Sequence, residues 1–167
     1  MKKKEDEAKI LRDRATRLSK PMEEPPSDLT RVVVFRLGNE LYGLEVVHVV
    51  EIFRPERLTP VPGALLYIEG VTNLRGEIVT VIDLRALLTG ETRGTLAKDR
   101  RVIVSATGRE RAGLLVDEVI GIHDIRAASI DPPLDTLKKL EADHLVGEFK
   151  LENDMIGLLN LTNILEA

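Results

Sequence analysis

The chain has 167 residues, of which 43% are hydrophobic and 3% aromatic, and it carries a net charge of −4. This length suits one domain or two small ones that share a core, and the absence of cysteine excludes disulfides and thiolate chemistry. An acidic, aromatic-poor chain also lacks the basic face and stacking rings of a nucleic-acid-binding barrel. No apolar run approaches the roughly 20 residues of a membrane helix, so we expect a cytoplasmic protein that does not insert directly into the membrane.

Residues 1–30 differ in character from the rest of the chain. Residues 1–20 carry eight Lys or Arg against four Asp or Glu. The pattern of residues 8–19 predicts a short amphipathic helix, and three prolines within 21–28 then predict a linker. Two interpretations of this mobile arm remain open: a frayed, solvated terminus, or a docking segment that orders on a partner. We therefore divide the chain into an N-terminal arm and Pro-rich linker, 1–30, and a folded domain, 31–167.

From Arg31 onward the sequence is typical of short strands joined by turns. The apolar alternation and turn residues predict strands and hairpins separated by short helices. Asp83 and Gly90 are suited to begin and end a helix over 84–89. The expected strand segments are 31–37, 40–50, the hairpin 67–84, the hairpin 101–122 and the hairpin 146–160; brief helices are expected near 134–140 and over 161–166.

Two halves of this body match each other. A displacement of 70 residues places 43–52 on 113–122 with the shared pattern Gly-Leu-x-Val-x-x-Val-x-x-Ile. A displacement of 77 places the hairpin 67–84 on the last hairpin, with Asp83 on Asn160. The sequence therefore predicts an all-β fold of two related units of about 70 residues, which curl into small barrels and pack on a shared aliphatic core.

The stretch Asn73-Leu74-Arg75-Gly76 is predicted to be the tip of a hairpin. Asn73 and Gly76 suit a type I turn closed by a left-handed glycine. Arg75 has no evident folding role, because it falls on Glu152 in the second unit. Glu51 likewise falls on Gly121, so the repeat leaves two opposite charges that the fold does not require and that could pair. The competing interpretation is that Arg75 is an ordinary solvated turn residue.

The sequence shows no pattern typical of an active site. It contains no phosphate-binding glycine loop and no Gly-x-Ser-x-Gly elbow. The three histidines, His48, His123 and His144, lack the spacing of metal ligands; His48 is expected to be structural and His144 exposed. We therefore expect no catalytic residue, no cofactor and no metal.

Several segments together resemble the CheW family of chemotaxis coupling proteins. The resemblance extends from about residue 31 to 167, and it includes the second half through Gly113-Leu114-Leu115-Val116-Asp117. It implies two five-stranded SH3-like barrels around a shared core. The segments that carry it in the first half are Phe35-Arg36-Leu37-Gly38-Asn39-Glu40-Leu41-Tyr42-Gly43-Leu44, Val49-Val50-Glu51-Ile52, Val61-Pro62 and 67–85, which contains Asn73-Leu74-Arg75-Gly76.

The resemblance also implies a function and partners. Such proteins are non-enzymatic adaptors that join the regulatory domain of a CheA-type histidine kinase to the cytoplasmic tips of chemoreceptors, and they associate with other CheW-like domains, sometimes as rings. It implies a coupling role for Glu51 and Arg75, with Asn73 and Gly76 in the same turn. Receptor helices are expected in the groove between the barrels, at apolar positions such as Val49, Val102, Val104 and Val116.

Two further interpretations remain open. Residues 1–30 are longer than a minimal member of the family needs, which leaves the same adaptor with a non-flagellar output, such as surface motility or development. A small-ligand-binding or hydrolytic barrel is the remaining alternative.

Overall fold

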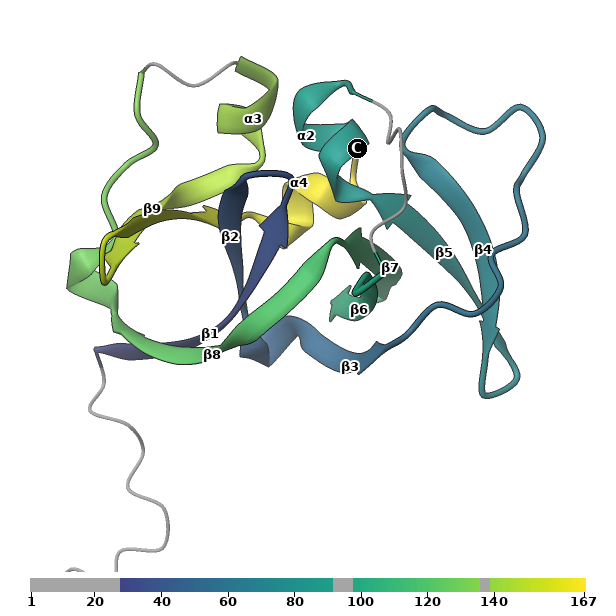
Figure 1. The fold of residues 1–167 in the computed structure, drawn as a ribbon, viewed down its shortest axis with the longest axis horizontal. Helices are drawn as coiled ribbons and strands as arrows, with labels where there is room; N and C mark the ends of the chain where they lie inside the picture. Colours follow the sequence, from purple (N-terminus) through teal and green to yellow (C-terminus); the bar gives the residue numbers. More distant parts are fainter. Residues whose placement is uncertain (1–27, 92–97, 136–138) are drawn as a thin grey trace, which may run out of the picture.

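The computed structural model describes residues 28–91, 98–135 and 139–167 (Figure 1). Residues 1–27 of the N-terminal arm, with the helix expected over 8–19, lie outside these residues, whereas Leu29 and Thr30 already belong to the first strand. Within them, no helix is long and apolar enough to cross a membrane.

In the described ranges, ten strands form two five-stranded sheets, which lie side by side in Figure 1. Sheet A has the order β8-β1-β2-β10-β9, and sheet B has the order β3-β6-β7-β5-β4. The all-β fold predicted from the sequence is confirmed. The strands are β1 (Leu29–Leu37), β2 (Glu40–Glu45), β3 (Val49–Phe53), β4 (Ile68–Leu74), β5 (Glu77–Asp83), β6 (Arg101–Thr107), β7 (Glu110–Val116), β8 (Glu118–Arg126), β9 (Leu145–Leu151) and β10 (Asp154–Leu159).

Short helices connect the strands. Helix α2 (Leu84–Thr89) begins at the carboxylate of Asp83, which accepts from the amides of Arg85 and Ala86, and it ends at the left-handed Gly90. These are the bounds and caps that the sequence predicts. The other helical elements are η1 (Val46–His48), η2 (Ala127–Ser129), α3 (Lys139–Asp143) and α4 (Leu161–Leu165).

The repeat seen in the sequence extends to the strand pairings. Displacement by 70 places β1 and β2 on β6 and β7, and displacement by 77 places β4, β5 and α2 on β9, β10 and α4. The parallel pair Val81–Gly113 in sheet B then corresponds to the pair Leu158–Gly43 in sheet A. The two sheets are therefore related by an approximate two-fold symmetry.

The two units nevertheless exchange strands. Sheet A joins β1 and β2 of the first unit to β8, β9 and β10 of the second, and sheet B joins β6 and β7 to β3, β4 and β5. The two expected five-stranded barrels are therefore present, but each is built from strands of both units, so the expectation that one unit alone forms each barrel is wrong. The single strand expected over 40–50 is wrong for the same reason: the chain leaves sheet A after Glu45, turns through η1 and enters sheet B at Val49.

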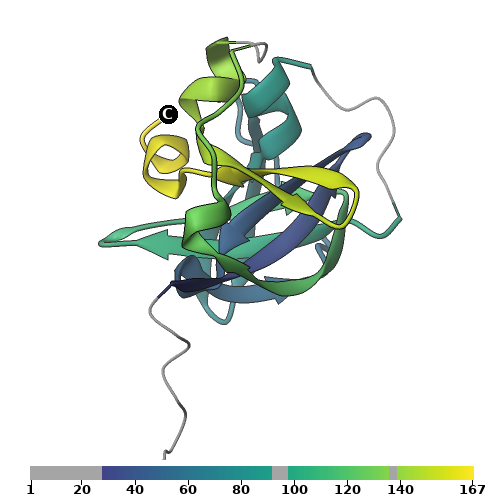
Figure 2. The ribbon, with the colours of Figure 1, turned by 90° about the vertical axis from the view of Figure 1, so that its left-hand side faces the viewer.

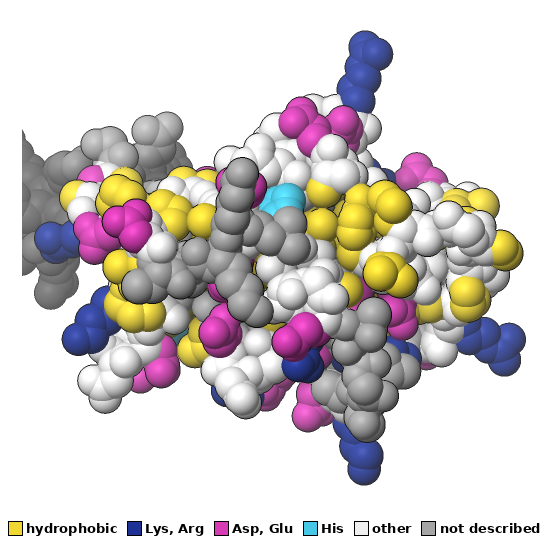
Figure 3. Space-filling model, turned by 90° about the horizontal axis from the view of Figure 1, so that it is seen from above, with side chains coloured by type: hydrophobic (Ala, Val, Ile, Leu, Met, Phe, Trp, Pro, Cys, Tyr) yellow, Lys and Arg dark blue, Asp and Glu magenta, His cyan; other side chains and the backbone are white. Residues whose placement is uncertain are grey.

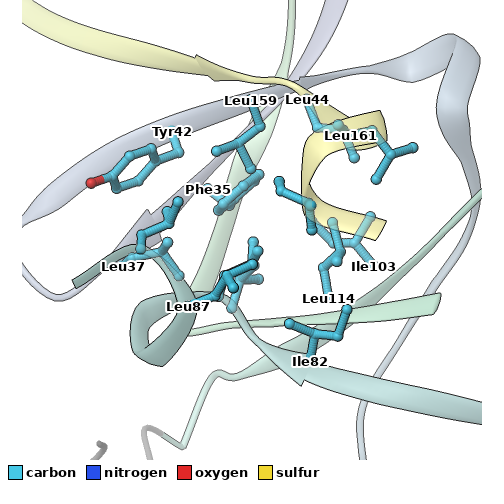
Figure 4. Close-up of a cluster of buried hydrophobic side chains, with 14 of the residues drawn as sticks. Phe35, Leu37, Tyr42, Leu44, Ile82, Leu87, Ile103, Leu114, Leu159 and Leu161 are labelled. Atoms are coloured by element: carbon cyan, nitrogen blue, oxygen red, sulfur yellow. The ribbon is translucent and has the colours of Figure 1, made fainter. Parts of the chain in front are cut away.

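The core occupies three adjoining regions. The largest cluster lies between the sheets and draws on both of them, with Phe35 and Leu44 from sheet A facing Ile103 and Leu114 from sheet B (Figure 4). A second cluster around Phe149 lies within sheet A, and a third around Leu115 lies within sheet B. The predicted shared core is confirmed, and each sheet also has a small interior of its own.

A close chain crossing recurs in both sheets. Thr59 pairs with Val71 at the edge of β4, and Asp131 pairs with Glu148 at the edge of β9. A Cβ on Gly70 would clash with the carbonyl oxygen of Thr59, and one on Gly147 would clash with that of Asp131. These matching glycines let the preceding loop cover the centre of each edge strand, which limits uncontrolled pairing there.

The termini of the described body lie apart. In the view turned by 90°, β1 begins at the lower side of the molecule, while the C-terminal helix α4 lies above (Figure 2). Helix α4 follows β10 of sheet A but packs on β6 and β7 of sheet B, which fastens the two sheets together.

Candidate protein-interaction site

The β4–β5 hairpin has a two-residue loop made of Arg75 and Gly76. Leu74 pairs with Glu77 across the loop, and both loop residues have positive φ, 54° and 85°. This is the pattern of a type I′ hairpin turn, so the type I turn expected from the sequence is wrong. Asn73 has a structural role, because its Oδ1 accepts a hydrogen bond from the amide of Gly76 at 3.0 Å.

The positive φ of Arg75 belongs to the architecture. A non-glycine residue in the left-handed region costs roughly 1–2 kcal/mol. Glu152, at the matching position of the β9–β10 hairpin, has nearly the same φ of 56°. Because both units tolerate this conformation, the strain marks the turn rather than a function of the arginine.

Arg75 and Glu51 form an ion pair, as the sequence suggested. Arg75 Nη2 donates to Glu51 Oε1 at 3.1 Å. Glu51 lies on β3 and Arg75 at the tip of β4–β5, which are opposite edges of sheet B, so the pair spans the curled sheet from its first strand to its last. The arginine side chain remains 81% exposed and that of the glutamate 23%. An exposed pair of this kind contributes about 0.2–1 kcal/mol to folding and leaves most of the guanidinium free for a partner.

An open cleft adjoins this ion pair. It has a volume of about 560 Å³ and lies between the chain that leaves β3 and the β4–β5 hairpin. Phe53, Leu74 and Ile78 supply apolar walls, and Asn73 and Thr72 are also among the lining residues. Ile78 is 77% exposed, so the hairpin presents an apolar side chain as well as a cation.

Three of the apolar residues predicted to touch a receptor are core residues. Val102, Val104 and Val116 are 0% exposed, so the prediction that they contact a partner is wrong. Val102 and Val104 fill the interior of sheet B, and Val116 packs between the sheets. Val49 is half-buried and packs against the shared core.

The exposed apolar residues near Val49 begin with the next residue of the same strand. On β3, Val50 and Ile52 are exposed; on β8, the matching residues Ile120 and Ile122 are exposed. Val49 and Val119, at the inner ends of the two strands, pack against the same core cluster, so two apolar rows lead outward from one centre. We call the four exposed residues, Val50, Ile52, Ile120 and Ile122, the apolar rows. The alternation in each strand, together with the repeat, could have revealed these residues, whereas their apolar type alone could not.

No cluster of His, Cys, Asp or Glu suited to a metal occurs among the described residues. His144 is buried, contrary to the exposed position expected, and burial lowers its pKa. Tyr42 donates toward Glu141 and lies 2.8 Å from Glu40, and burial raises the pKa of its hydroxyl. This contact ties α3 to β2.

The charges on the surface are mixed. Seen from above, acidic and basic side chains alternate around the face shown in Figure 3, and apolar side chains gather between them. The coloured part of that face shows no continuous basic field of the kind that binds a nucleic acid.

Comparisons with known proteins identify the family of this chain. The model of the CheW-like domain family matches residues 31–167. The chain belongs to this family. It is 36% identical to the protein FrzA of Myxococcus xanthus over 136 residues, covering 80% of this chain and 83% of that protein. It is 32% identical to the chemotaxis protein CheW of Klebsiella aerogenes, with 81% of each chain covered.

A solved structure shares the fold. The crystal structure of the scaffolding protein TtCheW from Thermoanaerobacter tengcongensis matches with a TM-score of 0.71 at 34% identity, covering 78% of this chain and 88% of that one.

A further relative in sequence is the protein PilI of Pseudomonas aeruginosa, which is 31% identical, covering 71% of this chain and 66% of PilI. The chain is therefore a member of the CheW family of chemotaxis adaptors, and its fold is that of a CheW scaffolding protein.

Proposed function

We propose that this chain is a non-enzymatic adaptor that couples methyl-accepting chemoreceptors to a CheA-type histidine kinase. The observation that carries the proposal is the Arg75–Glu51 pair, which lies at an exposed hairpin beside an apolar cleft. The second unit has Glu152 and Gly121 at the matching positions, so the fold does not require this pair. A cation beside apolar surface is a common composition for the centre of a protein contact.

The β4–β5 hairpin is the proposed contact for the kinase regulatory domain. Ile78 would enter an apolar site on the partner, and the Arg75 guanidinium would donate to an acidic group or a carbonyl at its edge. Glu51 holds the guanidinium in place before binding, so less side-chain entropy is lost on association. Asn73 and Gly76 act indirectly, because they set the turn that presents Arg75.

The apolar rows are the proposed contact for the receptor tip. A helix that lays an apolar stripe between Val50 and Ile52 on one side and Ile120 and Ile122 on the other would bury all four. Since the rows belong to different sheets, such a helix would touch both barrels at once. A shift of the receptor helix could then change the relative populations of kinase states through the adaptor.

The approximate symmetry also supports contacts with other CheW-like domains. Ile78 on β5 matches Met155 on β10, and both are exposed. In Figure 1 the β4–β5 hairpin and the strand β9 lie toward opposite ends of the molecule. Two similar ends that face apart suit head-to-tail association, which closes into a ring when the rotation allows it.

A second candidate is the same adaptor with another output, such as surface motility or development. The relatives named FrzA and PilI favour keeping it, since neither carries the chemotaxis name. Both candidates place the protein in the cytoplasm, associated with membrane receptors through their tips, and neither requires a cofactor.

Pull-down with purified partners tests the proposal. The chain should retain both a CheA regulatory domain and a receptor signalling fragment at micromolar concentration. If the chain bound neither the regulatory domain nor the receptor fragment, the adaptor function would be refuted. The small-ligand-binding barrel would then be the better interpretation.

A further inference from the structure

The apolar rows remain uncovered by the described part of the chain. Val50, Ile52, Ile120 and Ile122 are all exposed, and Val50 and Ile120 lie at matching register shifts in β3 and β8. Exposed apolar side chains favour an occupant, because their removal from water is favourable at about 25 cal/mol per Å². The question is what lies there when no receptor is bound.

The N-terminal segment enters the folded body beside these rows. Leu29, the first residue of β1, pairs with Arg126 at the end of β8, and Val33 pairs with Ile122. Four residues of strand separate the two pairs, which places Ile122 about 13 Å from the point of entry. The nine residues 20–28 span up to about 28 Å in the extended form that prolines favour. Residues 8–19 can therefore reach the rows from their own chain.

The sequence of residues 8–19 matches the rows in character. On the helix that the pattern predicts, Ile10, Leu11 and Leu18 share one stripe, and twelve residues extend about 18 Å. The segment carries four Lys or Arg against one Asp, whereas 45–53 and 117–126, which hold the rows, together carry five carboxylates against one arginine.

The electrostatic part of this complementarity is moderate. Four of the five carboxylates already have partners. Asp124 is paired with Arg31 at 2.9 Å, Glu118 with Arg36 at 2.7 Å and Glu51 with Arg75 at 3.1 Å. Asp117 accepts from the amide of Gly38. The pairs of Asp124 and Glu118 are exposed, so they are weak and can exchange partners with an approaching arginine. Apolar contact would supply the affinity, and the charges would guide the segment to this side of the body.

We propose that residues 8–19 occupy the apolar rows in the free protein and compete there with the receptor helix. The inference builds on the proposed function, since it concerns the regulation of the same site. Attachment through the short linker 20–28 gives the segment an effective concentration in the millimolar range, so a contact too weak to form between separate molecules is populated within one chain. The receptor must displace the segment, so its apparent affinity equals its intrinsic affinity multiplied by the fraction of chains whose apolar rows are open.

Cross-linking within the isolated full-length chain tests this directly. Because the chain has no cysteine, a pair of introduced thiols is free of competitors. The double variant Leu11→Cys/Ile122→Cys should form an intramolecular disulfide on mild oxidation. The matched control is Leu11→Cys/Met155→Cys: Met155 is similarly exposed and lies on β10, two strands from β1 in the same sheet. The first pair should oxidise about ten times faster, because only a docked segment holds those thiols together.

Two outcomes would overturn the proposal. Equal rates for the two pairs would mean that the segment samples the surface without a preferred site. Disulfides only between molecules would mean that a second copy, rather than the chain's own segment, covers the rows. Neither outcome bears on the adaptor function, because no receptor is present in this experiment.

A binding measurement then examines the consequence. The full-length variant Leu11→Asp/Leu18→Asp should bind the receptor fragment several-fold more tightly than the wild type, since its own segment no longer competes. The control Thr16→Asp adds charge to the opposite face and should leave the affinity unchanged. Unchanged affinity in the first variant would refute the competition, while absence of receptor binding in every variant, the wild type included, would instead refute the proposed function.

Discussion

Replacing Arg75 by alanine and by glycine separates the role of the guanidinium from the stability of the turn. Both changes remove the ion pair with Glu51, which contributes about 0.2–1 kcal/mol because it is exposed. They differ in the backbone, since position 75 has a φ of 54°. Alanine retains the left-handed strain of roughly 1–2 kcal/mol, and glycine relieves most of it at some cost in unfolded-state entropy.

The expected magnitudes follow from these contributions. Arg75→Gly should be about 1 kcal/mol more stable than Arg75→Ala, which in a chain of this size corresponds to a difference in Tm of roughly 2–4 °C. Both variants should lose affinity for the kinase regulatory domain equally, by about 1–3 kcal/mol if the guanidinium is desolvated in the complex. Thermal unfolding followed by circular dichroism gives the stabilities, and isothermal titration calorimetry gives the affinities.

The twin turn supplies the control. Glu152→Ala and Glu152→Gly should reproduce the difference in stability, because Glu152 has a φ of 56°, but should not repeat the loss of affinity for this partner site. If the affinity for the kinase followed stability across the four variants, Arg75 would be a turn residue and its proposed role in binding would be refuted.

Two further predictions concern the fold. Gly147→Ala should lower the free energy of unfolding by about 1–3 kcal/mol, because its Cβ would meet the carbonyl oxygen of Asp131. The control Gly43→Ala, whose Cβ would make ordinary contacts at 3.5 Å, should lower it by less. An equal loss at both positions would contradict the chain crossing at Gly147 as the cause. Burial lowers the pKa of His144 from 6.5, so the unfolded chain binds the proton more readily, and stability should be full above about pH 6.5 and fall below it. His144→Gln should flatten the decline in Tm between pH 7 and pH 5, and parallel curves for the two proteins would exclude this histidine as its source.

Local features of the fold were predictable from the sequence, because neighbouring residues determine them. Asp83 and Gly90 delimit α2 as expected, and the hairpins expected over 67–84 and 146–160 lie where alternation and turn residues place them. The hairpin expected over 101–122 is wrong in its second half, because β7 ends at Val116 and β8 pairs with β1 in sheet A. The exchange of strands was not predictable. The repeat shows which segments are alike, but their partners depend on contacts between residues far apart in the chain, from Val81–Gly113 to Leu41–Ile156. Alternation within a strand does not encode such contacts.

The candidate site shows the same division. Arg75 and Glu51 emerged because the repeat compares each position with a structurally equivalent one, and their pairing is observed. Val102, Val104 and Val116 were misassigned because β6 and β7 are buried on both faces there, one inside sheet B and the other between the sheets, which residue type alone does not reveal. The break at η1 was missed because the run Val46-Val47-His48-Val49-Val50 has strand propensity throughout, and tertiary packing overrides that propensity there.

The most direct test of the account is a comparison of two single variants against two partners. Ile122→Asp should abolish binding of the receptor signalling fragment and leave the affinity for the kinase regulatory domain unchanged, because it places a charge within the apolar rows. Arg75→Ala should show the converse pattern, with receptor binding intact. Loss of both partners by either variant, with the fold preserved, would contradict the claim that one rigid body presents two separate contact surfaces.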